Sequence, residues 1–445
     1  MNLRITVVGA GLAGCEAAWQ AAKRGIEVTL CEMKPEKKTP AHKSDGFAEL
    51  VCSNSLRSDD KNNAVGLLKE EMRLMGSLII EAADKTRVPA GSALAVDRNA
   101  FSDYVTGKLS SHPNIKIVSR EVLSAEPDTI TIIATGPLTS EPMAKYISDV
   151  LGISSLHFYD AAAPIVDGES IDCEKTYFAS RYGKGNAMDY LNCPMEKDEY
   201  LAFYEALLSA QTAKLHDFDD DEKISVFEGC MPVEVMASRG VDTLRYGPMK
   251  PVGLQNPKTG REPYAALQLR RENEAGTMYN LVGFQTHLTF PEQKRVFSMI
   301  PGLENAEFLR YGVMHRNTYI NSPGILAPDY SLITSPDIFF AGQMTGVEGY
   351  VESAASGMLA GISAARRLLG QSHIDFTKKT MTGALGHYIS EGGASGNFQP
   401  MNASYGIVEP LEVRVKGGKK MRYAEYSKRA LLTLSEIIRT EDILK

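Results

Sequence analysis

Residues 5–32 read ITVVGAGLAGCEAAWQAAKRGIEVTLCE, and they say more about the architecture than any other part of the chain. The β-branched run Ile5 to Val8 predicts a buried strand, and the spacing G-x-G-x-x-G follows it directly. Gly9 permits a tight turn, Gly11 lets the backbone approach a phosphate, and Gly14 lets the next helix pack close to the strand. The pattern predicts a Rossmann-type βαβ unit.

The continuation of this unit favours a bound dinucleotide. A helix is expected over residues 15–24, with its first N–H groups facing an anion and Gly25 placed to end it. A second strand over 27–31 leads to Glu32, about 20 residues beyond the glycines, where a carboxylate can bind ribose hydroxyls. The order of strand, glycines, helix, strand and acid favours a ligand site over an empty turn. This unit alone does not distinguish FAD from NAD(P).

Length and composition exclude several classes of protein. A chain of 445 residues can bury a large core and is expected to form at least two domains. No apolar run approaches the ~20 residues of a membrane span, and the apolar N-terminal stretch already serves as strand and phosphate loop, so a cytoplasmic protein without a membrane partner is expected. The net charge of −7 disfavours indiscriminate nucleic-acid binding but allows a local basic face.

Two of the six cysteines have settings that suit chemistry. The cysteines are scattered and form no C-x-x-C pair, which argues against a metal site and a disulfide framework. Cys52 lies among polar residues with Arg57 nearby, a setting that can lower a thiol pKa. Cys230 follows a glycine and precedes Met231-Pro232, which suggests a fixed turn. The remaining four are expected to be small buried hydrophobes: Cys15, Cys31, Cys173 and Cys193.

The C-terminal part contains a basic segment. Residues 414–429 read RVKGGKKMRYAEYSKR, with seven Lys or Arg against one Glu. Two interpretations stand side by side: a solvated terminal helix, which the sequence alone favours, and a patch that tracks RNA phosphates with Tyr423 and Tyr426 among the charges.

The domain organisation is expected to be discontinuous. Residues 129–136 form a β-rich run that ends in Ala-Thr-Gly, and a strand over 337–340 leads into glycine turns and a small-residue helix over 352–369. We therefore assign residues 1–150 and 310–445 to one discontinuous domain, and 151–309 to an inserted domain that faces substrate or RNA. The glycine-rich residues 383–406 are expected to form a loop region.

The chain also carries a family resemblance. The segment FFAGQMTGVEGYVESAASGMLAGISAARRLLG (339–370) resembles the one with which a group of flavoproteins closes its FAD site. With GAGLAGCEAA at the N-terminus, it makes the chain similar to the GidA-like flavoproteins, which modify tRNA uridines. A length of 445 residues leaves no room for the further helical domain of the large members. Long stretches such as FAELVCSNSLRSD (47–59) and FEGCMPVEVMASRGVDTLRYGPMKPVGL (227–254) resemble the short, folate- and FAD-dependent tRNA uracil-5-methyltransferase branch.

The resemblance implies an α/β fold, with a Rossmann-type FAD-binding domain like that of glutathione reductase and an inserted smaller α+β domain. It implies methylation of C5 of the T-loop uridine in tRNA, with 5,10-methylenetetrahydrofolate as carbon donor, reduced FAD as reductant and NAD(P)H to regenerate it. Cys52 and Cys230 match the family's catalytic pair, and either can be the nucleophile or the base. Competing hypotheses are the same chemistry on ribosomal RNA, a small-molecule flavin oxidoreductase, and a flavin-binding scaffold without catalysis.

The remaining expected site residues bind small molecules. His315 can stack on folate and Arg316 can pair with its carboxylates, although an ordinary loop histidine is an equal interpretation of His315, and His287 is a weaker candidate. No obligate protein partner and no metal are expected. The residues expected to bind FAD are Gly9, Ala10, Gly11, Leu12, Ala13, Gly14, Glu32, Gly136, Gly342, Gln343, Gly346 and Gly349.

Overall fold

The computed structural model describes residues 4–39, 41–152, 156–161, 163–183, 188–213, 231–272, 276–312, 314–392, 398, 400–413 and 415–444. For residues 156–161 and 314–317 it describes the backbone only.

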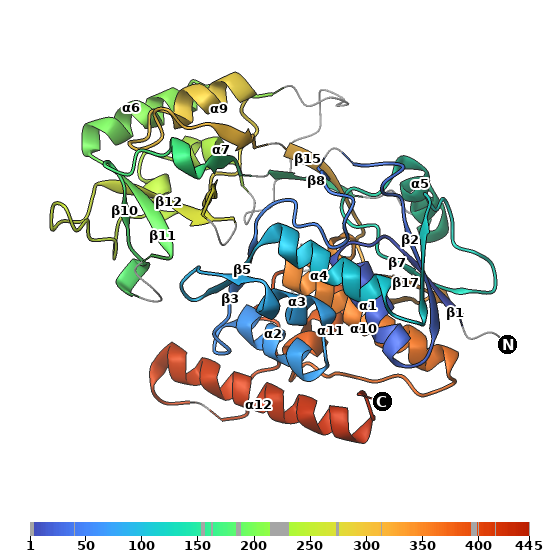
Figure 1. Cartoon of the computed structure of the whole chain (residues 1–445). Helices are drawn as coiled ribbons and strands as arrows, with labels where there is room; N and C mark the ends of the chain where they lie inside the picture. Colours follow the sequence, from blue (N-terminus) through green and yellow to red (C-terminus); the bar gives the residue numbers. More distant parts are fainter. Residues whose placement is uncertain are drawn as a thin grey trace.

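The larger lobe contains a six-stranded sheet, which lies at the right in Figure 1. Its order is β16-β17-β7-β1-β2-β6, and every neighbouring pair is parallel except β16 with β17. Val8 lies beside both Cys31 and Ile133, so the carboxyl ends of β1, β2 and β7 meet at one edge. Ligands of such sheets bind outside this edge. The strands are β1 (Arg4–Val8), β2 (Glu27–Glu32), β6 (Ile115–Ser119), β7 (Ile130–Ile133), β16 (Ser331–Leu332) and β17 (Ser335–Phe340).

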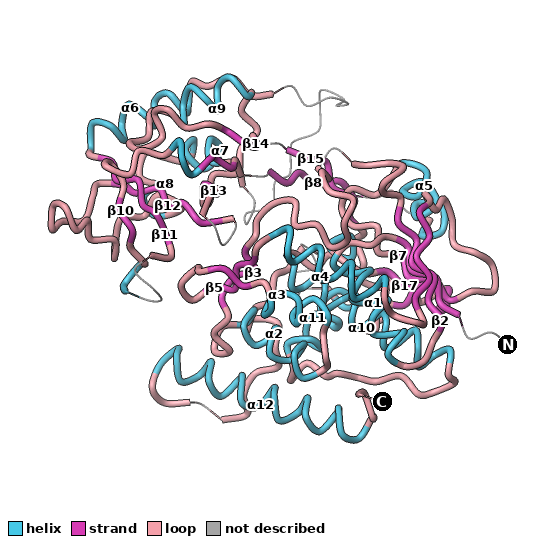
Figure 2. Tube along the Cα trace, in the orientation of Figure 1, coloured by secondary structure: helices cyan, strands magenta, loops and turns pink. Residues whose placement is uncertain are grey.

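Helices α1 (Leu12–Lys23) and α10 (Tyr350–Leu368) pack together against this sheet (Figure 2). Their approach depends on glycine, because a Cβ on Gly357 would lie 2.1 Å from Ala13 O and one on Gly361 would lie 2.5 Å from Ala17 O. The N-terminal and C-terminal parts of the chain therefore share one core. The other elements of this lobe are β3 (Ser55–Ser58), α2 (Ala64–Leu74), α3 (Leu78–Lys85), β4 (Arg87–Val88), β5 (Ala93–Val96), α4 (Arg98–Ser110), α5 (Glu141–Leu151) and α11 (Met381–Glu391).

The smaller lobe has its own sheet and its own core. The sheet has the order β10-β11-β12-β13-β9-β14, and its neighbouring strands are antiparallel. In the core that the helices cover, Phe284 stacks on Phe203 and meets Phe297 edge-on. The elements are β9 (Ile165–Asp167), β10 (Tyr177–Phe178), β11 (Tyr190–Met195), α6 (Lys197–Leu208), α7 (Val233–Ser238), α8 (Thr243–Tyr246), β12 (Ala265–Arg271), β13 (Met278–Leu281), α9 (Phe290–Phe297) and β14 (Phe308–Arg310).

The two lobes are joined by an antiparallel pair of strands, β8 (Leu156–Ala161) and β15 (Met314–Tyr319), which lies between them in Figure 1. The α/β fold with a parallel dinucleotide-type sheet and a smaller α+β unit is confirmed. The domain limits at residues 150 and 310 stay a prediction.

One sequence expectation about the larger lobe is wrong. The segment 383–406 does not begin as a loop, because α11 occupies Met381–Glu391. Its glycines serve close packing instead: a Cβ on Gly383 would lie 2.1 Å from Thr377 O, and one on Gly386 would lie 2.3 Å from Pro328 O. The side chain of Thr380 caps the helix by accepting a hydrogen bond from the Gly383 N–H.

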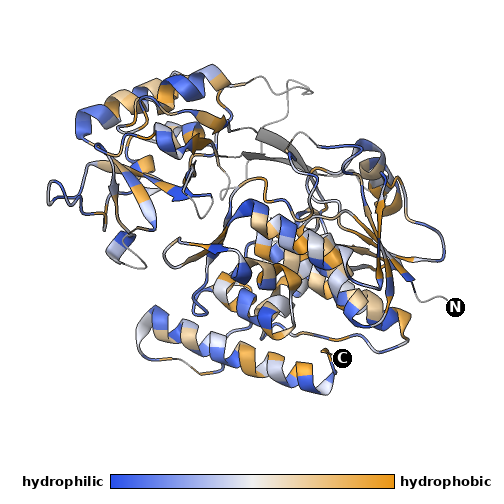
Figure 3. Ribbon diagram, in the orientation of Figure 1, coloured by the Kyte–Doolittle hydropathy of each residue, from blue (hydrophilic) through white to orange (hydrophobic). Residues whose placement is uncertain are grey.

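Helix α12 (Gly418–Thr440) lies along the outside of the larger lobe, beside α2. Figure 3 shows hydrophilic and hydrophobic residues alternating along it, and its buried face carries Ser427, Ala430 and Leu434. Tyr423 and Tyr426 pack against Tyr405, so their rings serve the contact with the lobe. In the part of the chain that the structure describes, no helix is both long enough and apolar enough to cross a membrane.

Candidate functional site

A large cavity opens at the carboxyl ends of β1, β2 and β7. About 1360 Å³ of free space lies within it, open solvent at its mouth included. The glycine loop, Glu32, the turn after β7, the segment after β17 and Cys52 all line it. Segments that lie more than 300 residues apart in sequence thus meet at one site.

The glycine loop has the geometry that a dinucleotide phosphate needs. Gly9 has φ +98°, and a Cβ on it would lie 2.6 Å from Ala134 O. A Cβ on Gly14 would lie 1.8 Å from Gly9 O, so α1 can begin this close to β1 only with glycine there. Around Gly11 the position of a Cβ has no atom within 4 Å, which leaves its backbone open on the cavity side. Helix α1 starts at Leu12, three residues earlier than expected, and its first N–H groups face the cavity.

Glu32 is held at the end of β2 by two backbone groups. Its carboxylate accepts hydrogen bonds from Ala10 N–H at 2.7 Å and from Lys34 N–H at 3.0 Å, and the residue is only 7% exposed. A carboxylate so placed beside the glycine loop suits ribose hydroxyls.

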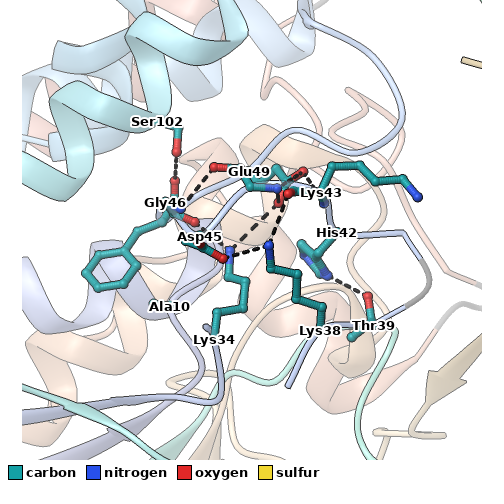
Figure 4. A network of polar contacts seen from close by, with 12 residues as sticks. Ala10, Lys34, Lys38, Thr39, His42, Lys43, Asp45, Gly46, Glu49 and Ser102 are labelled. Carbon is teal, nitrogen blue, oxygen red and sulfur yellow. Dashed lines mark hydrogen bonds and ion pairs between the residues drawn. The ribbon is translucent and has the colours of Figure 1, made fainter. Parts of the chain in front are cut away.

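Further polar residues, which the sequence did not single out, surround this end of the cavity (Figure 4). The buried amine of Lys34 donates to Gly46 O at 2.5 Å and lies 3.8 Å from the Glu49 carboxylate. His42 and Thr39 also line the cavity, with Nδ1 and Oγ1 2.6 Å apart. Burial, followed by the charge of Lys34, lowers the pKa of His42, which keeps its ring neutral at pH 7. No motif in the sequence signals these residues, because they follow the βαβ unit in an irregular segment.

The expected cofactor residues of the later segments divide into two groups. Gly136 at φ +72°, Gly342 at φ +91° and Gln343 line the cavity. Gly346 and Gly349 do not line it, and neither does Gly14. A Cβ on Gly346 would lie 2.4 Å from the Phe398 ring, and one on Gly349 would lie 2.5 Å from the Glu352 carboxylate. These three glycines permit close packing next to the cavity, and direct contact with a cofactor stays a prediction for all the expected residues.

Cys52 lies half-buried on the cavity wall and is held there by α10. The backbone N–H groups of Cys52 and Ser53 donate to the Tyr350 hydroxyl at 2.6 and 3.2 Å. Tyr350 is the first residue of α10 and lines the same cavity. Its burial, and then the nearby Cys52, raise the pKa of Tyr350, so the hydroxyl stays protonated at neutral pH. The second glycine-rich segment thus fixes the loop that carries the thiol.

The charged neighbour expected for Cys52 has another role. Arg57 forms an ion pair with the fully buried Glu352 and donates to Asn402 Oδ1 at 3.0 Å. This buried carboxylate attracts the guanidinium away from the thiol. Positive charge reaches the Cys52 loop from elsewhere, because the Nη2 atoms of Arg98 and Arg310 lie 3.4 and 3.3 Å from Cys52 O.

The other sequence candidates lie partly outside the described structure. Cys230 falls outside the described residues, so its pairing with Cys52 stays a prediction. His315 and Arg316 belong to β15, where they pair with Asp160 and Tyr159 of β8, and their side chains are not among those described. The side chain of His287 points to Glu234, with Nδ1 and Oε1 2.6 Å apart.

The remaining cysteines differ in burial. Cys15, Cys31 and Cys193 are buried as expected. The expectation for Cys173 is wrong, because it is exposed in a turn that the Lys175 N–H closes on Asp172 O at 3.2 Å. Among the residues that the structure describes, no group of three or more His, Cys, Asp or Glu is arranged to hold a metal ion.

Comparison with known proteins agrees with this geometry. The family described as glucose inhibited division protein A, GIDA, matches residues 4–372. The chain belongs to the GidA family. Within this family it is 59% identical over 434 residues to the methylenetetrahydrofolate--tRNA-(uracil-5-)-methyltransferase TrmFO of Acetivibrio thermocellus, covering 98% of each chain. It is also 58% identical over 440 residues to TrmFO of Staphylococcus aureus, covering 99% of this chain and 100% of the relative.

Solved structures show the same fold. The structure of Aquifex aeolicus GidA in its form I crystal superposes on this GidA-family chain with a TM-score of 0.71 at 16% identity. The match covers 100% of this chain and 77% of the Aquifex protein. At this identity the likeness supports the fold alone.

Proposed function

We propose that the protein methylates C5 of the T-loop uridine in tRNA, with 5,10-methylenetetrahydrofolate as carbon donor and FAD, reduced by NAD(P)H, as reductant. The observation that carries the proposal is that a single cavity is lined by the dinucleotide loop, Glu32 and Cys52 in a chain 59% identical to a TrmFO enzyme. A thiol beside a redox cofactor is what reductive alkylation of a uracil requires.

The residues of the cavity fit FAD. Gly11 leaves room for a pyrophosphate, the first N–H groups of α1 can bind it, and Glu32 can accept bonds from ribose hydroxyls. Gly136, Gly342 and Gln343 would contact the remainder of the molecule. Reduced FAD, when bound, supplies the hydride that turns a methylene group into a methyl group.

The overall reaction balances without a further reagent. The C5–H bond of uridine breaks and a bond from C5 to the folate methylene carbon forms. The methylene gains a hydride, the C5 proton is released, and the products are 5-methyluridine, tetrahydrofolate and oxidised FAD. NAD(P)H then restores the reduced cofactor.

Cys52 and Cys230 divide the chemistry on the uracil ring. A thiolate that adds to C6 places electron density on C5, which then attacks the methylene carbon. The second cysteine takes the C5 proton as a general base, and loss of the first thiolate restores the ring. The hydrogen bonds from the Cys52 loop to Tyr350 would hold the backbone that carries the thiol during these steps.

Folate and NAD(P)H bind in the same cleft in this proposal. His315 would stack against the folate ring system, and Arg316 would pair with the carboxylates of its tail. The chain has no second G-x-G-x-x-G motif of its own for NAD(P)H. Because tRNA and folate are cytoplasmic substrates in this scheme, we place the enzyme in the cytoplasm.

The alternatives are less well supported. Ribosomal RNA as substrate, or a small molecule, would require a change of specificity from relatives named as tRNA methyltransferases at 58–59% identity over nearly the whole chain.

The proposal is tested by methyl transfer to an unmodified tRNA transcript. The protein is incubated with FAD, NADPH and 5,10-methylenetetrahydrofolate labelled in the methylene carbon, and a parallel reaction contains labelled S-adenosylmethionine instead. We expect label in T-loop 5-methyluridine only in the folate reaction. Label from S-adenosylmethionine, or none in tRNA from a yellow and reducible protein, would contradict the proposal.

A further inference from the structure

Three guanidinium groups from three separate elements converge on the loop that carries Cys52. Arg98 is the first residue of α4, Arg270 lies in β12, and Arg310 ends β14. The Nη2 atoms of Arg98 and Arg310 donate to Cys52 O at 3.4 and 3.3 Å. Arg270 continues the pattern along the loop, donating to Ser53 Oγ at 2.7 Å and to Asn54 Oδ1 at 2.8 Å.

Among the described residues around the Cys52 loop, positive charges outnumber negative ones. Among these residues, Glu272 is the carboxylate that faces the three arginines, and it forms an ion pair with Arg98. The two tyrosines next to the arginines, Tyr190 and Tyr350, carry no charge at neutral pH, because burial raises both pKa values. Three guanidinium groups against one carboxylate leave an excess of about two positive charges.

This excess is costly in a buried place unless an anion accompanies it. Arg270 is only 6% exposed, and the Nε atom of Arg310 is buried without a hydrogen-bond partner. Burial lowers the pKa of both arginines, and in each case the nearby Cys52 and Glu272 oppose this change. A negative charge on Cys52 therefore stabilises the cluster, and the cluster stabilises that charge in return.

We propose that Arg98, Arg270 and Arg310 are positioning residues that hold Cys52 as a thiolate on the cavity wall. Arg270 and Arg310 belong to the smaller lobe and Arg98 to the larger one, so docking of the two lobes brings the three charges together at the Cys52 loop. Asn54 strengthens this docking, since its Nδ2 donates to Arg271 O at 2.8 Å and to Val96 O at 3.0 Å. The inference rests on the proposed role of Cys52 in methylation.

The hydrogen bonds of the cluster favour this role over substrate binding. Arg98 is used by Glu272, Leu50 O and Cys52 O, and Arg270 is used by Ser53 and Asn54. Guanidinium groups that already make these hydrogen bonds have few N–H donors left for a phosphate or a folate carboxylate. Their positive field still acts on the thiol.

The test is the pH dependence of Cys52 alkylation in the FAD-loaded protein, without RNA or folate. Iodoacetamide is added over a range of pH, and the labelled peptides are quantified by mass spectrometry. Cys173 is exposed and serves as the reference thiol in the same sample. In the wild type we expect the midpoint for Cys52 to lie at least one pH unit below the value of about 8.5 for an ordinary thiol.

Arg310→Gln removes one charge and keeps a polar side chain of similar shape. We expect the Cys52 midpoint to rise by about one unit, which slows alkylation roughly tenfold at pH 7 while Cys173 is unchanged. Arg310→Lys keeps the charge and is expected to restore most of the shift. The matched control is Arg367→Gln, a surface arginine paired with Asp337, which should leave the Cys52 midpoint in place.

Two results would overturn the inference. They are a wild-type midpoint near 8.5, and an unchanged midpoint in Arg310→Gln, whether or not the KM for folate rises in that variant. If Arg310→Gln does not fold, Arg270→Gln gives the same comparison, with Arg270→Lys as the variant that keeps the charge. Since the assay needs no methyl transfer, a shifted thiol in a protein without methylation activity would separate this inference from the proposed function.

Discussion

Gly11→Ala and Gly14→Ala add the same methyl group to one turn of chain, yet the structure predicts opposite consequences. The new Cβ at residue 11 would have no atom within 4 Å, and it would project beside the cavity. The new Cβ at residue 14 would lie 1.8 Å from Gly9 O, where real Cβ contacts stay above 3.0 Å. Gly14→Ala must therefore separate α1 from the end of β1 by about 1 Å.

The magnitudes follow from the packing. Overfilling a close contact costs about 1–3 kcal/mol, and we expect about 3 kcal/mol of lost stability for Gly14→Ala because the contact is with backbone. Gly11→Ala weakens only the start of the helix, by about 1 kcal/mol or less. In the complex, however, its methyl group occupies space for a phosphate, and a steric cost of 1–3 kcal/mol corresponds to roughly 5- to 150-fold weaker FAD binding.

The assay separates the two effects. The single tryptophan of the chain, Trp19, lies in α1, so its fluorescence during urea unfolding of the apoprotein reports the stability of this lobe. Flavin fluorescence on titration with FAD gives the dissociation constant. Gly107→Ala is the control, because Gly107 lies inside α4 with no atom within 4 Å of a Cβ, and alanine there is expected to stabilise slightly. Wild-type urea midpoints for Gly14→Ala together with wild-type FAD affinity for Gly11→Ala would refute the reasoning.

Three further predictions concern other parts of the molecule. Cys52→Ala should lower the rate of methyl transfer at least 1,000-fold while FAD stays bound. Its control is Cys173→Ala in the exposed turn, which should retain activity. Normal turnover by Cys52→Ala would show that Cys52 has no part in the mechanism. Burial lowers the pKa of Lys69 to about 7 in the folded protein, whereas the ordinary value is 10.5. Above pH 7 the folded protein therefore binds fewer protons than the unfolded chain, and its free energy of unfolding should rise with pH. Between pH 7 and 9 this amounts to roughly 2–3 kcal/mol, which urea titrations should detect in the wild type and should not find in Lys69→Met. The triple variant Lys416→Gln, Lys419→Gln and Lys420→Gln should change tRNA affinity less than twofold in a filter-binding assay. The reason is that the tyrosines beside these exposed lysines pack against Tyr405 and leave α12 a solvated helix. If the slope of log affinity against log salt concentration fell by about two or three in the variant, the RNA phosphates would instead bind to this helix.

The βαβ unit was predictable because its information is local. The β-branched strand, the three glycines and the acid of residues 5–32 each occupy a position whose backbone or side-chain requirement few other residues meet. The same is true of the small residues of α10, which allow its contact with α1. Even so, α1 begins three residues before the expected start, since the loop glycine Gly11 itself serves as the N-cap.

The errors arise where a residue's role depends on distant parts of the chain. Gly383 and Gly386 suggested a loop, but they face backbone carbonyls of Thr377 and Pro328 inside a packed helix. Arg57 lies next to Cys52 in sequence, yet its partner Glu352 is 295 residues away. The arginines that do reach the Cys52 loop come from positions 46 to 258 residues away. No local pattern encodes such contacts, because they depend on how distant segments pack within the larger lobe and, for Arg270 and Arg310, on how the two lobes dock.

The most direct test of the central claim is a single turnover without NAD(P)H. The FAD-loaded protein is reduced chemically under anaerobic conditions, mixed with methylene-labelled 5,10-methylenetetrahydrofolate and unmodified tRNA, and followed by flavin absorbance and by label in 5-methyluridine. We predict one labelled methyl group in tRNA for each flavin that becomes oxidised, and no transfer from the protein with oxidised FAD. Transfer that is independent of the redox state of the flavin, or flavin oxidation without label in tRNA, would contradict the account.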